Sequence, residues 1–207
     1  MSRTILITTG ATETFKDLIQ FAVSKQFLEY LVTENFTHLI VQYGPDQSII
    51  STSSHLTPVD NNNNNNSVES CPAKSNLQFF TFKQSLSVET YAFNSALSND
   101  ILKADYVISH AGTGSILDSL RAHRPLIVVV NNQLMDNHQA EIAKALKDLE
   151  LLEWAEFDKS MNDEANYDQV IKKLKAILSN DIKFKEFPAP RNGVLNNILA
   201  EELGLLF

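Results

Sequence analysis

The sequence predicts an α/β fold: a Rossmann-like, mostly parallel sheet with helices on both faces. Tyr106–Ser109 and Leu126–Val130 are short apolar runs, rich in β-branched residues and without polar alternation. Such runs are typical of strands that are buried on both faces of a parallel sheet. A glycine-containing turn and a helical pattern separate them, and a strand, a glycine turn and a helix also open the chain. Repetition of this unit indicates the α/β class.

Composition limits the size and the partners of the protein. The chain has 207 residues, of which 43% are hydrophobic, enough for one domain with a sizeable core. The formal charge of −8 argues against nucleic acid and against direct attraction to anionic lipid. The single cysteine, Cys71, cannot form an internal disulfide, and no run of about 18 apolar residues could span a bilayer. We therefore expect a cytosolic chain.

The first strand is expected at Thr4–Thr9, followed by a tight turn at Gly10. A helix should begin near Phe15, with Thr14 and Asp17 as a capping pair. Its apolar residues recur at helical spacing through Phe27. The sequence contains no Gly-x-Gly-x-x-Gly motif and no Walker lysine at this turn. A dinucleotide site and an ATP site are therefore not supported.

The middle of the chain contains an asparagine-rich tract. A second strand is expected at His38–Tyr43. The polar stretch at about 46–76, with six consecutive asparagines, has too few apolar residues to offset its ordering entropy. It is predicted to be a disordered insertion. A third strand is expected at Leu77–Phe82, and then a helix across Val88–Leu102.

Candidate ligand-binding residues follow the two buried strands. In an open α/β sheet, ligands bind outside the carboxyl ends of the strands, where His110–Ser115 and Asn131–Gln139 would lie. Gly112 and Gly114 would let the backbone approach a ligand, and hydroxyls stand between and after them, ahead of a helix N-terminus. Such a turn suits a phosphate. The alternative is that Ser115 is only an N-cap, which Asp118 completes, and both can be true.

Three amphipathic helices are expected in the remainder of the chain. Asn137–Leu149 should be helical, which places Asn137, His138 and Gln139 in its first turn, where carboxamides and imidazole can contact sugar hydroxyls. The alternative is a simple cap at Asp136 or Asn137. A helix is expected at Tyr167–Leu178. After Phe187-Pro-Ala-Pro, a last helix at about Gly193–Leu206 has an apolar stripe of Val194, Leu195, Ile198, Leu199, Leu203 and Leu206.

The segment His110-Ala-Gly-Thr-Gly-Ser-Ile-Leu-Asp118 resembles the donor-binding signature of two-domain glycosyltransferases that use uridine-diphosphate sugars. The longer run through Leu134-Met-Asp-Asn-His-Gln139 resembles the catalytic subunit of the eukaryotic two-subunit N-acetylglucosaminyltransferase of dolichol-linked oligosaccharide synthesis. That subunit is similar to the C-terminal half of the bacterial transferase that makes lipid II. The resemblance implies the donor-binding half of a GT-B glycosyltransferase.

The resemblance also implies roles for particular residues. The turn at Gly10, Ala11 and Thr12 would face the diphosphate and the acceptor. His110 and the segment Gly112, Thr113, Gly114 and Ser115 would hold the diphosphate, and Asp118 would accept hydrogen bonds from ribose. The sugar would contact Asn137, His138 and Gln139. The backbone just past the third strand, near Phe82 and Lys83, would read the uracil edge.

The implied enzyme moves N-acetylglucosamine from its uridine diphosphate to dolichyl-diphosphate-N-acetylglucosamine, with inversion, as a β1,4 linkage. No metal and no cofactor are expected. The catalytic base is not assigned: it is expected from the partner half, with His110 as the candidate in this chain. The implied partner is a membrane-anchored second subunit, which would recruit the chain to the cytosolic face of the endoplasmic reticulum. Residues 1–186 would form the donor domain, and 187–207 a tail that docks the partner.

Two other functions fit parts of the sequence. A regulatory subunit of the same fold could bind a nucleotide sugar without transferring it, because a donor site alone does not establish transfer. A nucleotide-binding oxidoreductase is disfavoured by the missing glycine fingerprint.

Overall fold

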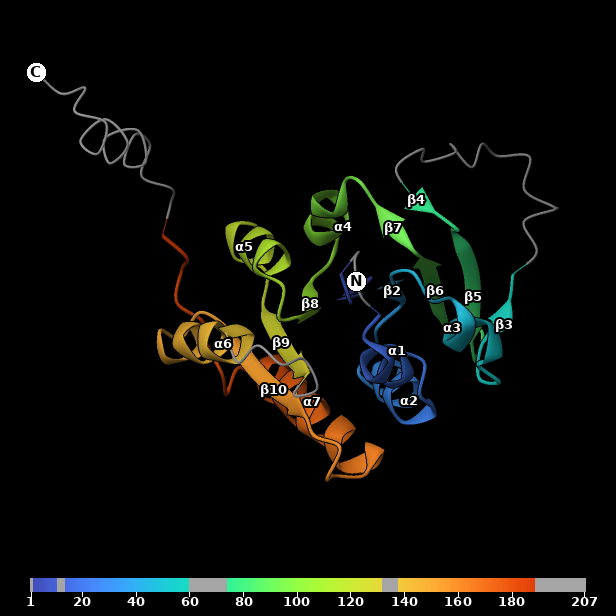
Figure 1. The fold of residues 1–207 in the computed structure, drawn as a ribbon. Helices are drawn as coiled ribbons and strands as arrows, with labels where there is room; N and C mark the ends of the chain where they lie inside the picture. Colours follow the sequence, from blue (N-terminus) through green and yellow to red (C-terminus); the bar gives the residue numbers. More distant parts are fainter. Residues whose placement is uncertain (1, 11–13, 60–73, 132–137, 189–207) are drawn as a thin grey trace, which may run out of the picture.

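A sheet of eight strands forms the centre of the structure, a computed structural model that describes residues 2–10, 14–59, 74–131 and 138–188 (Figure 1). The strand order is β10-β9-β8-β1-β2-β6-β5-β3. Six strands are parallel, namely β1 (Thr4–Thr8), β2 (His38–Gln42), β6 (Leu86–Tyr91), β8 (Tyr106–His110), β9 (Leu126–Asn131) and β10 (Glu153–Phe157). At one edge β5 (Gln78–Phe82) and β3 (Thr57–Pro58) run antiparallel. A separate pair joins β4 (Lys74–Ser75) to β7 (Phe93–Asn94).

Helices cover both faces of this sheet (Figure 1). One hydrophobic core joins the sheet to α1 (Lys16–Ala22), α2 (Lys25–Thr33), α3 (Ser48–Thr52) and α7 (Asp163–Leu178). The other joins the opposite face to α4 (Leu97–Lys103), α5 (Thr113–Arg121) and α6 (His138–Asp148). The predicted fold class, a mostly parallel sheet with helices on both faces, is confirmed. None of the helices in the described part of the chain has the length and apolar character needed to cross a bilayer.

Strand β1 is the point at which the order of the sheet reverses. The chain passes from β1 to β2 and then to β6 on one side, and returns to build β8, β9 and β10 on the other. Leu6 of β1 is paired with Ile40 of β2 and with Val107 of β8. Connections leave the carboxyl end of such a sheet in opposite directions, which opens a crevice there. The crevice is expected where β1 and β8 end.

The predicted first helix is two helices. Ser24 interrupts it with an extended backbone, and its side chain accepts a hydrogen bond from the amide of Phe27 as the N-cap of α2. Serine is favoured at such a cap over a helix interior because its hydroxyl satisfies an amide that has no partner within the helix. The predicted cap of Thr14 with Asp17 is wrong, since Phe15 is the N-cap of α1 and no side chain bonds there.

The predicted helix across Val88–Leu102 is also wrong, because this range holds part of β6, then β7 and most of α4. Lys83 and Gln84 have positive φ angles of 49° and 57° and join β5 to β6 in a tight turn. Leu86 and Val88 then point into the core while Ser87 between them is exposed. This alternation has the period of a strand.

The predicted insertion at 46–76 is partly ordered. It contains α3, β3 and β4, and Ile50 of α3 is buried in the core. Apolar residues such as Ile50 and Leu56 supply the contacts of its described N-terminal part. Residues 60–73, with the six asparagines, and residues 189–207, with the predicted docking helix, lie outside the described residues, so the division at residue 186 stays a prediction.

Sequence reasoning missed β10, which carries a buried carboxylate. Glu153 is 8% exposed and accepts from Lys147 of α6 at 2.7 Å and from Lys173 of α7 at 2.9 Å. Burial raises the pKa of Glu153, but the two ammonium groups outweigh it and hold that pKa below its usual value. The pair of contacts ties α6 and α7 to the outer strand.

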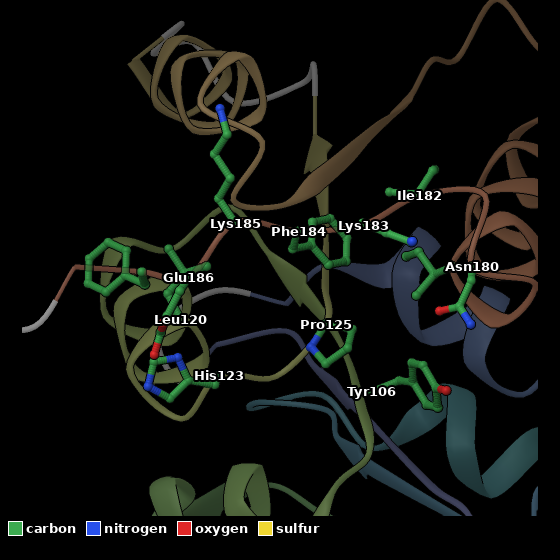
Figure 2. A pocket seen from close by; sticks show the side chains of 12 residues that line it. Tyr106, Leu120, His123, Pro125, Asn180, Ile182, Lys183, Phe184, Lys185 and Glu186 are labelled. Atoms are coloured by element: carbon green, nitrogen blue, oxygen red, sulfur yellow. The ribbon is translucent and has the colours of Figure 1, made fainter.

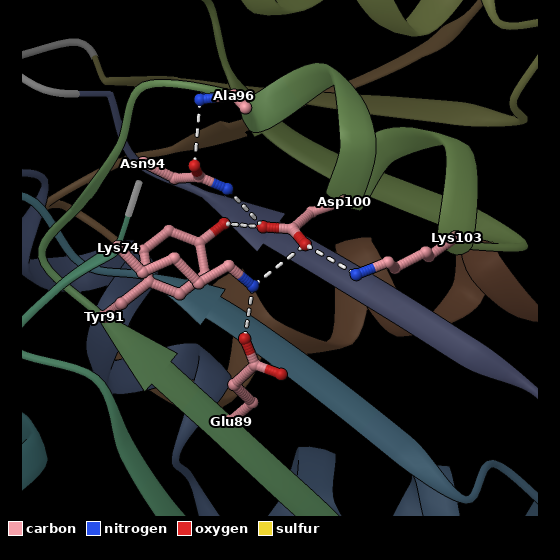
Figure 3. Close-up of polar contacts among 7 residues, drawn as sticks. All are labelled: Lys74, Glu89, Tyr91, Asn94, Ala96, Asp100 and Lys103. Carbon is pink, nitrogen blue, oxygen red and sulfur yellow. Dashed lines mark hydrogen bonds and ion pairs between the residues drawn. The ribbon is translucent and has the colours of Figure 1, made fainter. Parts of the chain in front are cut away.

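A second buried charge cluster joins β4, β6 and α4 (Figure 3). Asp100 is 1% exposed and accepts from Lys74 at 2.9 Å and from the Tyr91 hydroxyl and the Asn94 amide at 2.7 Å each. Lys74 also bonds Glu89, and its side chain is only 6% exposed. Burial raises the pKa of Tyr91, so its hydroxyl stays a donor to the carboxylate. The cluster fixes the chain at Lys74, directly after residues 60–73.

A buried lysine and an exposed lysine both approach the Asp100 carboxylate. Replacing them should lower the free energy of unfolding by unequal amounts. Lys74→Met leaves Asp100 and Glu89 without their buried cation and should lower the free energy of unfolding by about 3 kcal/mol. Lys103 is 70% exposed and 3.9 Å away, so Lys103→Met should cost less than about 1 kcal/mol. Urea denaturation of both variants measures the difference. Equal costs would show that the cluster contributes no more than a surface pair.

Candidate functional site

The turns that follow β1 and β8 lie side by side at the carboxyl edge of the sheet. Thr8 is paired with Ser109 in the register of the two strands, so Gly10 and Gly112 leave neighbouring strand ends. Gly10 has a φ of +86°, a conformation that a residue with a side chain rarely adopts. The structure therefore brings together the two predicted turns. Ala11 and Thr12 of the first turn lie outside the described residues.

Gln42 holds the first turn in place, and sequence reasoning did not identify it. It is 2% exposed at the end of β2. Its side-chain oxygen accepts from the Thr8 hydroxyl at 2.5 Å, and its side-chain nitrogen lies 3.4 Å from the carbonyl oxygen of Gly10, to which it donates. The signal was present in the sequence, because a glutamine at the end of an apolar strand must find partners when it is buried.

His110, the last residue of β8, fills the space between the two turns. Its Nδ1 lies 3.3 Å from the carbonyl oxygen of Thr8 on β1. A β-carbon added at Gly10 would lie 2.7 Å from His110 Nε2, and one added at Gly112 would lie 2.2 Å from it. Both separations are shorter than real contacts allow. A side chain at either position would therefore force the imidazole ring to move, independently of any ligand.

Gly114 differs from the other two glycines of the site. A β-carbon at Gly114 would meet no other atom of the described structure within 4 Å, and the residue is exposed. Gly114 lies in the first turn of α5, where its freedom to adopt unusual backbone angles is not used. The space above it is open to a ligand.

The N-terminus of α5 presents polar groups to this space. Gly112 is the N-cap, with no side-chain cap hydrogen bond, so the predicted cap at Ser115 is wrong: Ser115 already lies within the helix. The first backbone bond of the helix runs from the Ile116 amide to the Gly112 carbonyl. The amides of Thr113, Gly114 and Ser115 precede it and have no partner within the helix. Such amides, with the helix dipole, favour an anion.

Asp118 lies one turn further along α5. Its side chain is 46% exposed and 3.9 Å from Arg121, a weak surface pair. Because the helix begins at Thr113, Asp118 is too far along to complete a cap. Its carboxylate is available to a ligand that extends over α5.

The third predicted group follows β9. The strand ends at Asn131, beside β8, and α6 begins at His138. The predicted placement of His138 and Gln139 in the first turn of a helix is confirmed, while Asn137 lies outside the described residues.

The predicted uracil contact near Phe82 and Lys83 is wrong. These residues follow β5, which runs antiparallel to β6, so they lie at the opposite edge of the sheet from Gly10 and Gly112. Lys83 is 56% exposed and pairs with Glu29 at 2.9 Å. The parallel strand beside β2 is β6, which was hidden by the helix predicted in its place.

A cavity of about 580 Å³ also opens at that opposite edge (Figure 2). Tyr106 at the start of β8 and Pro125 before β9 line it, and the segment after α7 forms its other wall through Ile182, Phe184 and Phe187. None of the described residues of the two glycine turns lines it. It is therefore separate from the predicted donor site.

Comparison with protein families agrees with this geometry. The model of the glycosyltransferase family 28 C-terminal domain matches residues 4–189. The chain belongs to this family. The matched range covers the whole described sheet and both glycine turns. In an open α/β sheet, ligands bind outside the carboxyl ends of the strands, which is where these turns lie.

Individual relatives support the assignment. The chain is 34% identical to the Candida albicans UDP-N-acetylglucosamine transferase subunit ALG13, over 97% of this chain and 74% of the relative. It is 36% identical to the Saccharomyces cerevisiae protein of the same name, over 71% and 74%. The solution structure of ALG13 matches with a TM-score of 0.67, 30% identity and coverage of 97% and 96%. Acinetobacter baumannii MurG, at 16% identity, shares the fold, with a TM-score of 0.57 over 86% of this chain and 43% of that one.

The glycines of this family 28 domain should respond oppositely to alanine. Gly112→Ala forces a methyl group into the His110 ring and should lower the free energy of unfolding by about 1–3 kcal/mol. Gly114→Ala should raise it by about 0.5 kcal/mol, because alanine is the better helix residue and the space is free. Urea denaturation compares the two with the parent chain. Equal destabilisation would contradict the distinct roles assigned to the two glycines.

Proposed function

We propose that this family 28 domain binds UDP-N-acetylglucosamine at the carboxyl ends of β1 and β8 and supplies the donor half of an N-acetylglucosaminyltransferase. The observation that supports it is the N-terminus of α5, where no atom of the described structure lies near Gly114, the amides of Thr113, Gly114 and Ser115 have no partner within the helix, and two of these residues carry hydroxyls. The relatives' names specify the nucleotide sugar. The diphosphate would lie on these amides and hydroxyls.

The remaining predicted residues have proposed roles around a donor held in this way. Asp118 is one helical turn from Ser115 on α5 and would accept from the ribose hydroxyls. Asn137, His138 and Gln139 would contact the sugar, and α6 begins at His138, after the neighbouring strand β9. Gly10, Ala11 and Thr12 would face the diphosphate from the other turn.

The proposed reaction is an inverting transfer to dolichyl-diphosphate-N-acetylglucosamine. The acceptor's 4-hydroxyl oxygen bonds to the anomeric carbon, the bond from that carbon to the diphosphate oxygen breaks, and uridine diphosphate leaves with the electron pair. The hydroxyl proton passes to a base that the partner half supplies. In this chain, the amides at the α5 N-terminus stabilise the charge that develops on the leaving diphosphate.

The lipid acceptor requires a membrane-bound partner. We propose a second, membrane-anchored subunit that completes the cleft and holds this chain at the cytosolic face of the endoplasmic reticulum. The relatives are each named as a subunit, which supports assembly with another chain. The apolar stripe of residues 194–206 is the proposed docking segment, since a stripe of this kind must be covered.

Asp118→Ala tests the ribose contact. Loss of a charged acceptor should weaken UDP-N-acetylglucosamine binding at least tenfold, while the free energy of unfolding changes by less than about 0.5 kcal/mol. Arg121→Ala removes the same ion pair but keeps the carboxylate, so its affinity should equal that of the parent chain. Calorimetric titration and urea denaturation measure the two quantities. Unchanged affinity in Asp118→Ala would remove this residue from the site.

The docking segment is tested by paired charges. Leu199→Asp with Leu203→Asp should leave a folded chain that no longer sediments with the membrane fraction and loses transfer to the lipid acceptor. Asn196→Asp with Asn197→Asp adds the same charge off the stripe and should change neither. If the leucine variant unfolds, the stripe belongs to the domain's own core; if it stays with the membrane, docking occurs elsewhere.

A further inference from the structure

The position of His110 restricts which of its ring nitrogens carries the proton. Nδ1 lies 3.3 Å from the carbonyl oxygen of Thr8, and a carbonyl can only accept. Nδ1 is therefore the donor, and in the neutral ring Nε2 is left without a proton. Nε2 is also the atom nearest to the positions that β-carbons at Gly10 and Gly112 would occupy.

The surroundings of His110 favour the neutral ring. Burial lowers the pKa of His110 below its usual value, and the bond to the Thr8 carbonyl only partly opposes this. The ring bonds Thr8 of β1 and lies against Gly10 and Gly112 of the two turns. Within Thr4–Gly10 and Tyr106–Ser115 the only ionisable side chains are His110 itself and Tyr106, at the far end of β8. No anionic side chain in these described segments stabilises a cation.

We propose that His110 is a positioning residue: as a neutral imidazole it spaces the two glycine turns, and it does not pair with the diphosphate as a cation. The proposal rests on the donor site proposed above. The negative charge of the donor is then met by the amides and hydroxyls at the start of α5, whose position relative to β1 depends on the ring. If His110 instead paired with the diphosphate as a cation, the ring would have to take up a proton when the donor binds. The affinity for the donor would then depend on pH.

Proton linkage separates the two roles. UDP-N-acetylglucosamine is a suitable probe because both of its phosphates are esterified and neither titrates near neutral pH. The full chain is titrated calorimetrically from pH 7.0 to 8.5, in two buffers of different ionisation enthalpy. A positioning role predicts no proton uptake and a Kd that changes less than about twofold. Uptake of about one proton, with a Kd that rises about tenfold per pH unit, would overturn the proposal. Absence of binding at every pH would instead contradict the proposed function.

Substitutions of His110 provide the second test. His110→Ala removes the spacer and should weaken donor binding more than tenfold. Asparagine is neutral and can donate to the Thr8 carbonyl as Nδ1 does, so His110→Asn should recover most of the affinity lost in His110→Ala. If asparagine is as poor as alanine while His110→Lys binds as well as the parent chain, charge is what the site needs and the proposal is wrong.

A double-mutant cycle tests the spacing without any ligand. Gly112→Ala should lower the urea midpoint of the parent chain, because the added methyl group meets the ring. In a His110→Ala background the same substitution should lower the midpoint much less, since the obstructing ring is absent and only the cost of alanine at an N-cap remains. Gly114→Ala, where no atom of the described structure is in the way, should give the same shift in both backgrounds. Additive effects of Gly112→Ala and His110→Ala would show that the ring does not hold the two turns apart.

Discussion

The contact between the His110 ring and the two glycine turns is the constraint on which the candidate site depends. Parallel pairing of β1 with β8 brings the two turns to one edge, but pairing alone does not set the distance between them. The ring fills that distance, and the bond from Nδ1 to Thr8 prevents it from turning away. Gly10 and Gly112 are then needed so that the ring can fit. The His110 ring and the two glycines that leave room for it thus form one structural unit.

The two buried carboxylates support this unit from a distance. Glu153 fixes α6 and α7 to β10, and Asp100 fixes α4 and the chain at Lys74 to the other side of the sheet. Transferring two charges from water into the protein interior costs free energy. A buried ion pair therefore favours one arrangement chiefly because any arrangement that separates the pair would leave an uncompensated buried charge, which costs more. Of the helices held in this manner, α4 packs against α5, whose N-terminal amides form the candidate site. A site made of backbone amides requires a fixed helix, because an amide cannot adjust by rotating a side chain.

The sequence was sufficient for the fold class and for the part of the site that lies on consecutive residues. Buried parallel strands such as β8 and β9 appear as apolar runs, and the turn between β8 and α5 follows directly. What failed depended on turns and strand pairings that the apolar pattern alone does not reveal. Val88 fits a helix as well as a strand until β5 is known to pair with β6, and that pairing requires the turn at Lys83 and Gln84. The misplaced uracil contact followed from the same error.

The roles of the glycines show why the rest could not be read from a motif. Gly112 and Gly114 are two residues apart in a pattern that suggests one purpose, close approach to a phosphate. Among the described residues, no atom lies close to a β-carbon position at Gly114, while the space beside Gly112 is filled by the side chain of His110 from the same segment. Gly10 lies about 100 residues away in the sequence, yet a β-carbon there would meet the same His110 ring as one at Gly112. The spacing of glycines in the sequence indicates that small residues are needed, but only the fold shows which neighbouring atoms leave no room for a side chain. A glycine in such a motif therefore cannot be assigned to the ligand until the neighbouring side chains have been placed.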